Sequence, residues 1–178
     1  IWLERAGLVR TIDQRRLPHD YVVADLTAWQ HGHEAIADML VRGAPLIGAT
    51  AAWSLYLAAR LGRSEFDRAT RDLAQARPTA VNLRWAVHRV ARCAADLDGD
   101  DLVNRVREEA ESICTEDIDI SRRIGRHGLA LIREIADARG GEPVNVLTHC
   151  NAGALATINY GTATAPLYLA HKEGIPIH

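Results

Sequence analysis

The chain has 178 residues, of which 48% are hydrophobic and 25% are charged, proportions typical of a globular protein with a substantial buried core. Its formal net charge of -2 provides no basic excess for neutralising the phosphates of a nucleic acid, so we expect no nucleic-acid partner. No apolar run approaches the roughly eighteen residues that a membrane span requires, so we expect no membrane association either.

The three cysteines of the chain are Cys93, Cys114 and Cys150, which lie far apart and form no CxxC or Cys/His metal-binding spacing. This usage favours reduced thiols in the cytoplasm over a disulfide framework, and it predicts no metal site. The sequence starts at Ile1 and stops at His178, within a segment that is predicted to begin another strand. We therefore expect the chain to be part of a longer protein.

The amino-terminal region predicts a small β-hairpin followed by a helix. Leu8–Ile12 and Tyr21–Val23 are β-favouring runs, and a turn at Pro18 separates them. The helix should end near Arg42-Gly43, because a glycine commonly follows the last helical turn. The predicted buried face of this helix consists of Ala35, Ile36, Met39 and Leu40.

Three further helices are expected in the next part of the chain. The first should begin at Pro45, which suits a first helical turn, and run to Leu61, with small residues that permit close helix packing. The second should start at Ser64 and stop before Pro78, because the residue before a proline is pushed out of the α region. The third should open at Pro78 and continue to the break at Asp98.

From Asp101 to Arg139 the sequence predicts a long helical region, which a break near residues 115–117 could divide. Apolar residues at helical spacing indicate its buried side. These are Leu102, Val106, Ala110, Ile113, Ile120, Ile124, Leu131, Ile132 and Ile135.

Gly140 and Gly141 end this helical region, and the change in composition there marks the best domain boundary in the chain. A strand at 144–148, a helix through 160–173 and a strand at 175–177 would make one βαβ unit. Gly174 should cap the helix.

These elements predict an α/β fold class with two domains. Residues 1–141 should form a mostly helical amino-terminal domain with a small β-hairpin. Residues 142–178 should form the first βαβ unit of a doubly wound, Rossmann-like domain.

Two arginines stand at predicted helix starts. Arg42-Gly43-Ala44 precedes Pro45, and Arg77 precedes Pro78, so a guanidinium lies beside free backbone N–H groups in both places. A helix amino-terminus with an arginine is a phosphate site. The alternative for both is an ordinary turn between helices with a solvated arginine, because glycine and proline are common in such turns.

Cys150 follows a predicted buried strand and precedes small residues that should form a turn into a helix. Ligands bind at the carboxyl ends of strands in open parallel sheets, and the backbone N–H groups that follow Cys150 would lower the pKa of its thiol. A nucleophilic or proton-transferring cysteine is therefore the hypothesis. The alternative is a buried small hydrophobic residue, which is the better interpretation of Cys93 and Cys114.

Two further clusters have structural explanations. His31 and His33 lie in a His-Gly-His-Glu segment without further ligands, so a solvated loop is favoured over a metal site. The acidic run Glu116–Asp119 could turn a carboxylate towards a sugar hydroxyl. We favour capping of a second half of the long helix, because acidic residues suit helix starts.

Three segments in this order resemble the 5-methylthioribose-1-phosphate isomerases of methionine salvage. They are VRGAPLIGATAAWSLYLAA (41–59), ARPTAVNLRWAV (76–87) and LTHCNAGALATINYGTA (147–163). IDQRRLPHDY and EDIDISRRIGRHG are similar to that family as well. This family shares its fold with ribose-1,5-bisphosphate isomerases and with regulatory subunits of initiation factor 2B.

The resemblance implies an aldose–ketose isomerase that converts 5-methylthioribose 1-phosphate to 5-methylthioribulose 1-phosphate, without a metal ion or cofactor, as a homodimer. It implies that Cys150 and an aspartate later in the chain act at the sugar. It places Arg42, Gly43, Ala44 and Arg77 on the substrate, a small-molecule sugar phosphate. The aspartate has no counterpart before His178.

Two alternatives stay open. One is isomerisation of a related pentose phosphate, such as ribose 1,5-bisphosphate or 5-deoxyribose 1-phosphate. The other is a non-catalytic regulatory subunit like those of initiation factor 2B. The residues that follow Cys150, NAGALAT, resemble those of the methylthioribose enzymes.

Overall fold

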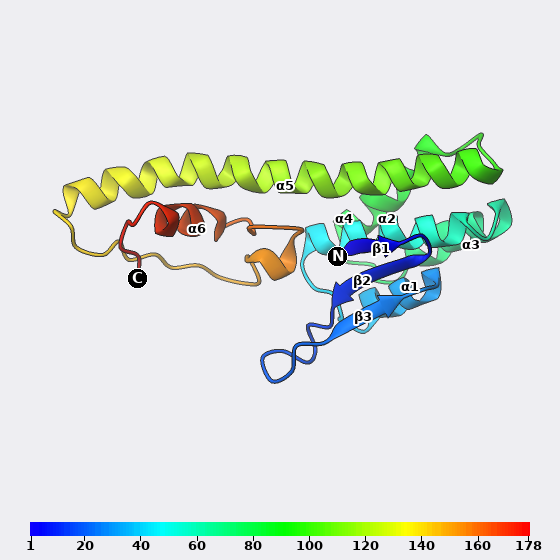
Figure 1. Ribbon diagram of the computed structural model, residues 1–178, viewed down its shortest axis with the longest axis horizontal. Helices are drawn as coiled ribbons and strands as arrows, with labels where there is room; N and C mark the ends of the chain where they lie inside the picture. Colours follow the sequence, from blue (N-terminus) through cyan, green and yellow to red (C-terminus); the bar gives the residue numbers. More distant parts are fainter. The chain divides into compact units, whose positions relative to one another are not determined.

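The computed structural model describes residues 1–178 and contains a three-stranded antiparallel sheet and six α-helices (Figure 1). The chain divides into two compact units, Ile1–Cys114 and Thr115–His178. The elements, in order, are β1 (Trp2–Arg5), β2 (Leu8–Ile12), β3 (Val23–Leu26), α1 (Trp29–Ala37), α2 (Ala44–Ala59), α3 (Arg63–Leu73), α4 (Val81–Cys93), α5 (Gly99–Ala138), the 3-10 helix η1 (Ala154–Ala156) and α6 (Ala165–Lys172). None of the helices is apolar enough over a sufficient length to cross a membrane.

The predicted hairpin is confirmed as β2 and β3, which pair antiparallel with Val9 opposite Leu26 and Ile12 opposite Val23. Its second strand starts at Val23 and not at Tyr21, whose side chain is exposed. β1, which adds a third strand on the other side of β2, has no counterpart in our expectations. Its four residues bury no alternating face, so the period-two signal of a strand is missing.

α2 is the central helix of the first unit and contacts α1, α3 and α4 (Figure 1). Almost every side chain from Leu46 to Ala59 is buried, so the helix has no polar face. The hydroxyls of Thr50 and Ser54 donate to the carbonyls four residues earlier, both at 2.7 Å, which satisfies them inside the core. The predicted helix with close neighbours is thus confirmed.

α1 ends at Ala37, five residues before the expected stop at Arg42. Met39 takes a left-handed backbone conformation with φ 57°, and the N–H of Val41 returns to the carbonyl of Ala35 at 3.1 Å. This turn exposes Met39 and buries Val41 in its place. The predicted buried face was therefore right for Ala35 and Ile36 and wrong for Met39.

α4 begins at Val81, so Pro78 does not open it as expected. Residues 77–80 instead form a turn, in which the N–H of Ala80 donates to the carbonyl of Arg77 at 3.0 Å. α3 ends at Leu73, clear of the proline.

α5 is one continuous helix of 40 residues, so the expected break near residues 115–117 was wrong. That segment contains polar residues but no proline or glycine, and polarity alone does not end a helix. The buried side was correctly predicted for Leu102, Val106, Ala110, Ile113 and Ile132. It was wrong for Ile120, Ile124, Leu131 and Ile135, which are exposed.

In the second unit α6 packs on the face of α5 that carries Gly125 and Gly128, beside the buried Leu129 and Ile132. A Cβ on Gly128 would lie 2.3 Å from Cγ of Pro166, and one on Gly125 would lie 3.3 Å from the carbonyl oxygen of Ala165. The two glycines therefore let the first turn of α6 rest directly on α5.

The expected βαβ unit is present in reduced form. Val144 and Ile177 form a parallel bridge, and the N–H of Val146 donates to the carbonyl of His178 at 2.8 Å. Neither segment is a full strand, and α6 starts at Ala165 and not near residue 160. Gly174 ends α6 with φ 74°, as predicted. The Rossmann-like sheet beyond this bridge remains a prediction.

The two compact units meet at residue 114, inside α5, because the second half of that helix packs against α6 and Val144. The sequence predicted domains at 1–141 and 142–178. That boundary stays a prediction, since grouping by contact does not show which part folds independently.

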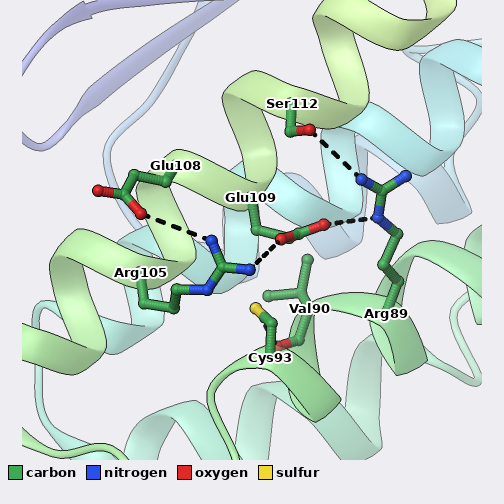
Figure 2. Close-up of polar contacts among 7 residues, drawn as sticks. All are labelled: Arg89, Val90, Cys93, Arg105, Glu108, Glu109 and Ser112. Atoms are coloured by element: carbon green, nitrogen blue, oxygen red, sulfur yellow. Dashed lines mark hydrogen bonds and ion pairs between the residues drawn. The ribbon is translucent and has the colours of Figure 1, made fainter.

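Glu109 on α5 ties that helix to α4 within the first unit, as Figure 2 shows. Its buried carboxylate accepts from Nε of Arg89 at 2.5 Å and from Nη2 of Arg105 at 2.8 Å. Burial, followed by the charge of Glu109, raises the pKa of the nearby Cys93 thiol. Cys93 donates to the carbonyl of Val90 at 3.1 Å, so this partly buried thiol should react more slowly than a free one.

Replacing Glu109 by Ala should lower the free energy of unfolding by about 2 to 4 kcal/mol, because two partly buried guanidinium groups lose their shared partner. Glu108→Ala is the matched control. Its side chain is 67% exposed and also pairs with Arg105, so it should change stability by less than about 0.5 kcal/mol. Urea unfolding measures both; equal effects would contradict the role given to Glu109.

Replacing Gly128 by Ala should lower stability by more than about 1 kcal/mol, because the added Cβ would overlap the rigid ring of Pro166. Helix propensity alone predicts the opposite, a gain of about 1 kcal/mol. The sign of the change in urea unfolding decides between the two.

Candidate functional site

The amino-termini of α2 and α4 lie side by side in the first unit. A Cβ on Gly48, in the second turn of α2, would lie 3.2 Å from the carbonyl oxygen of Asn82, in the first turn of α4. No side chain caps either helix. The first turns of both helices therefore bring free N–H groups and the positive ends of two helix dipoles to one place.

Gly43 shapes the start of α2. Its φ of 98° is open to glycine and unfavourable for other residues, and its carbonyl accepts from the N–H of Ile47 at 3.0 Å. Pro45 occupies the first turn, where its missing N–H is not needed. Arg42 precedes this turn, is exposed and has no ion pair. The glycine turn into a helix that we expected at Gly43-Ala44 is thus present, whereas phosphate binding by Arg42, Gly43 and Ala44 stays a prediction.

Arg77 reaches the same part of the unit from the turn before α4. Its Nη2 lies 3.6 Å from Sδ of Met39, which places the guanidinium against the segment that leads to Arg42. Its Nη1 is buried and has no hydrogen-bond partner. An unsatisfied buried donor is costly and uncommon in folded proteins, and an anion such as phosphate would satisfy Nη1 of Arg77. Arg42 and Arg77 are therefore brought to one region, as the phosphate hypothesis requires.

Cys150 lies in the second unit, four residues after Val146, which pairs with His178. Its side chain is exposed, so the alternative of a buried small hydrophobic residue was wrong for this cysteine. Its φ of 70° is unusual for a residue with a Cβ and stores local strain, which is common at functional sites.

The segment that follows Cys150 does not lead directly into an α-helix. Residues 151–153 are irregular, and only the short helix η1 follows. The reason is that the carbonyl of Ala152 is engaged elsewhere: it accepts from the N–H of Thr162 at 2.9 Å and from Oγ1 of Thr164 at 3.2 Å. These bonds fold the segment after Cys150 back on itself.

Asp117 is a residue of this region whose role the sequence did not reveal. Its carboxylate accepts from the N–H of Ile158 at 2.8 Å, so it caps neither half of α5. Partial burial raises its pKa, and the bond from Ile158 opposes that shift. The available signal was its spacing: Asp117 is four residues from both the buried Ile113 and the buried Ser121.

The His-Gly-His-Glu segment lies inside α1, so the solvated loop that we expected there was wrong. Nδ1 of His31 accepts from the backbone N–H of Thr27 at 3.2 Å, at the start of α1. Gly32 lies against α2, where a Cβ would meet Oγ of Ser54 at 1.8 Å. The structure contains no group of three or more His, Cys, Asp or Glu side chains that could hold a metal ion.

The predicted site residues therefore belong to two units. Arg42, Gly43, Ala44 and Arg77 lie in the first, and Cys150 lies in the second. That all of them act on one substrate stays a prediction.

Residues 40–178 match the model of the initiation factor 2 subunit family. The whole chain is 49% identical to the methylthioribose-1-phosphate isomerase of Cereibacter sphaeroides and 46% identical to that of Rhodospirillum centenum. It covers 49% and 48% of those proteins, so the chain spans about half the length of the curated relatives that it matches.

Two solved structures are similar over nearly the whole chain. The 5-methylthioribose 1-phosphate isomerase of Pyrococcus horikoshii has a TM-score of 0.83 and 33% identity, over 98% of this chain and 49% of that one. The delta subunit of translation initiation factor eIF-2B from A. fulgidus has a TM-score of 0.76 and 30% identity, over 97% and 53%.

The anion site predicts that inorganic phosphate raises the melting temperature of the full-length protein, because a ligand that binds only the folded state stabilises it. Arg77→Met should remove most of this increase. Arg92→Met is the control, since Arg92 is an exposed arginine in the last turn of α4 and should keep the increase. An undiminished phosphate effect in Arg77→Met would contradict the site.

Proposed function

The chain belongs to the initiation factor 2 subunit family, and from this premise we propose that the full-length protein is a sugar-phosphate isomerase. Its substrate is 5-methylthioribose 1-phosphate and its product is 5-methylthioribulose 1-phosphate. The observation that carries the proposal is the buried Nη1 of Arg77, which has no hydrogen-bond partner, beside two uncapped helix amino-termini. Relatives named as this isomerase match the chain throughout its length.

The first unit supplies the phosphate site in this proposal. The N–H groups at the start of α2 and α4 bind the phosphate oxygens, and Arg42 and Arg77 provide charge-assisted hydrogen bonds. Gly43 allows the backbone to approach the anion closely. Holding the phosphate fixes the position of C1, to which it is attached, and of the neighbouring C2.

The chemistry is an internal redox exchange. C2 is oxidised from an alcohol to a ketone and C1 is reduced to a CH2 group, while the phosphate stays on C1. The bond between C1 and the ring oxygen breaks, one hydrogen moves from C2 to C1, the ring oxygen takes up a proton and the C2 hydroxyl loses one. No external oxidant is needed, so no cofactor is required. Because the phosphate blocks opening of the ring as a free hemiacetal, the ring must open with help from an acid at the sugar.

Cys150 acts at the sugar in this proposal. Its thiol is exposed on a strained backbone, after a segment that pairs parallel with 176–178, which is where sheet proteins present reactive groups. The partner acid is expected to be an aspartate outside these residues. We further propose that the enzyme works in the cytoplasm as a homodimer.

A regulatory, non-catalytic role is the second candidate, because the similarity to the delta subunit of initiation factor eIF-2B also extends over nearly the whole chain. Isomerisation of ribose 1,5-bisphosphate or 5-deoxyribose 1-phosphate is a third, since contacts to the 5-substituent are not defined by these residues. Parallel assays of the three sugars with the full-length protein separate the candidates.

In the full-length protein, Cys150→Ser should lower kcat for 5-methylthioribose 1-phosphate by at least about 100-fold with little change in KM, because a proton-transferring group is lost. Cys114→Ser serves as the control and should keep normal kcat. Steady-state kinetics test this. Near-normal turnover in Cys150→Ser would exclude the catalytic role of this thiol.

A further inference from the structure

Asp117 is an unusual residue for its position. It lies in the middle of the 40-residue helix α5, where aspartate is a poor helix former, and it is half-buried. Its Oδ2 accepts one hydrogen bond, from the N–H of Ile158 at 2.8 Å. The raised pKa of this carboxyl reflects the unfavourable burial of its charge. Low helix propensity and the burial of its charge both make Asp117 unfavourable at this position. The hydrogen bond from Ile158 is therefore expected to have a specific role.

Ile158 belongs to a tight turn formed by residues 157–161. The buried hydroxyl of Thr157 donates to the carbonyl of Asn159 at 3.2 Å and accepts from the N–H of Gly161 at 3.1 Å. Tyr160 takes a left-handed conformation with φ 66° within it. The bond from Ile158 to Asp117 therefore anchors a turn that is already held together internally.

This turn contacts the segment of Cys150. Gly161 packs so closely that a Cβ would lie 2.4 Å from the carbonyl oxygen of Ala152. The same oxygen accepts from the N–H of Thr162 and from Oγ1 of Thr164. Ala152 follows Cys150 by two residues, so the turn restrains the backbone that carries the strained thiol residue.

We propose that Asp117 is a positioning residue for Cys150: it anchors the 157–161 turn, and that turn holds Ala152 and so sets the direction of the thiol. Asp117 contacts only backbone in this role and takes no part in the chemistry. The inference rests on the proposed function, in which Cys150 acts on the sugar.

The test compares variants of the full-length protein. Asp117→Ala removes the acceptor, and Asp117→Asn keeps an uncharged oxygen that can accept from Ile158. Asp119→Ala is the matched control, because its carboxylate is 64% exposed and pairs only loosely with Arg122 at 3.7 Å. Three measurements are made on each: kcat and KM, the alkylation rate of Cys150 by iodoacetamide with Cys93 and Cys114 as internal references, and the melting temperature.

Asp117→Ala should lower kcat by about 10- to 100-fold with KM changed less than about threefold, since a small misplacement of a reacting group has effects of this size. Its Cys150 alkylation rate should change several-fold relative to Cys93. Asp117→Asn should keep kcat within about threefold of the value of the unreplaced protein, because its amide oxygen can still accept the hydrogen bond from Ile158. Asp119→Ala should leave both kcat and alkylation unchanged.

A lower melting temperature of Asp117→Ala with unchanged kcat and Cys150 alkylation would overturn the inference, because Asp117 would then be structural only. Asp117→Asn as impaired as Asp117→Ala would overturn it too, since charge and not the hydrogen bond would matter. If Asp117→Ala does not fold, Asp117→Ser, too short to reach Ile158, takes its place with the same expectations. If the unreplaced protein lacks isomerase activity, the proposed function fails, whereas the alkylation comparison still decides the positioning of Cys150.

Discussion

The enclosure of α2 is the constraint on which the first unit depends. Because α1, α3 and α4 contact it and nearly all its side chains are buried, α2 can present polar groups only at its ends. α4 packs closely against α2 at Gly48, so the amino-termini of the two helices lie side by side. The candidate phosphate site is therefore a consequence of core packing: apolar burial along the helices brings the dipoles, Arg42 and Arg77 together at their ends.

In the second unit, glycines and hydrogen bonds hold the loop that starts at Cys150. Gly125 and Gly128 let α6 rest on α5, which fixes the end of the loop that starts at Cys150. Asp117 and the Ala152 carbonyl hold the middle of that loop. An exposed thiol on strained backbone is thereby attached to a rigid helix through a short series of bonds, an arrangement suited to a reacting group.

Much of this fold could be predicted from the sequence, and the failures have physical causes. The pattern of apolar residues predicted the β2–β3 hairpin and α2. The conformational preferences of glycine and proline predicted the turn at Arg42-Gly43-Ala44-Pro45. The early end of α1 depends on the left-handed backbone of Met39, which no periodicity reveals. The exposed Ile120 and Leu131 show another limit: an apolar stripe indicates a helix face but does not say which neighbour covers it.

The candidate site was predictable to a similar extent. The sequence pointed to Arg42 and Arg77 because each is a charged side chain at a turn into a helix. It pointed to Cys150 because a reactive thiol follows the end of a predicted strand. It did not point to Asp117, because the only partner of this residue is 41 residues away in the sequence and is a backbone group without any side-chain signature. The short irregular segment after Cys150 was equally hidden, since it is set by long-range bonds to Thr162 and Thr164.

The most direct test of the account is 13C NMR of purified full-length protein mixed with 5-methylthioribose 1-phosphate labelled at C1 and C2. The account predicts that a ketone carbon resonance appears at C2 while the C1 resonance becomes that of a CH2 group still coupled to phosphorus. A folded protein that leaves both resonances unchanged would contradict it.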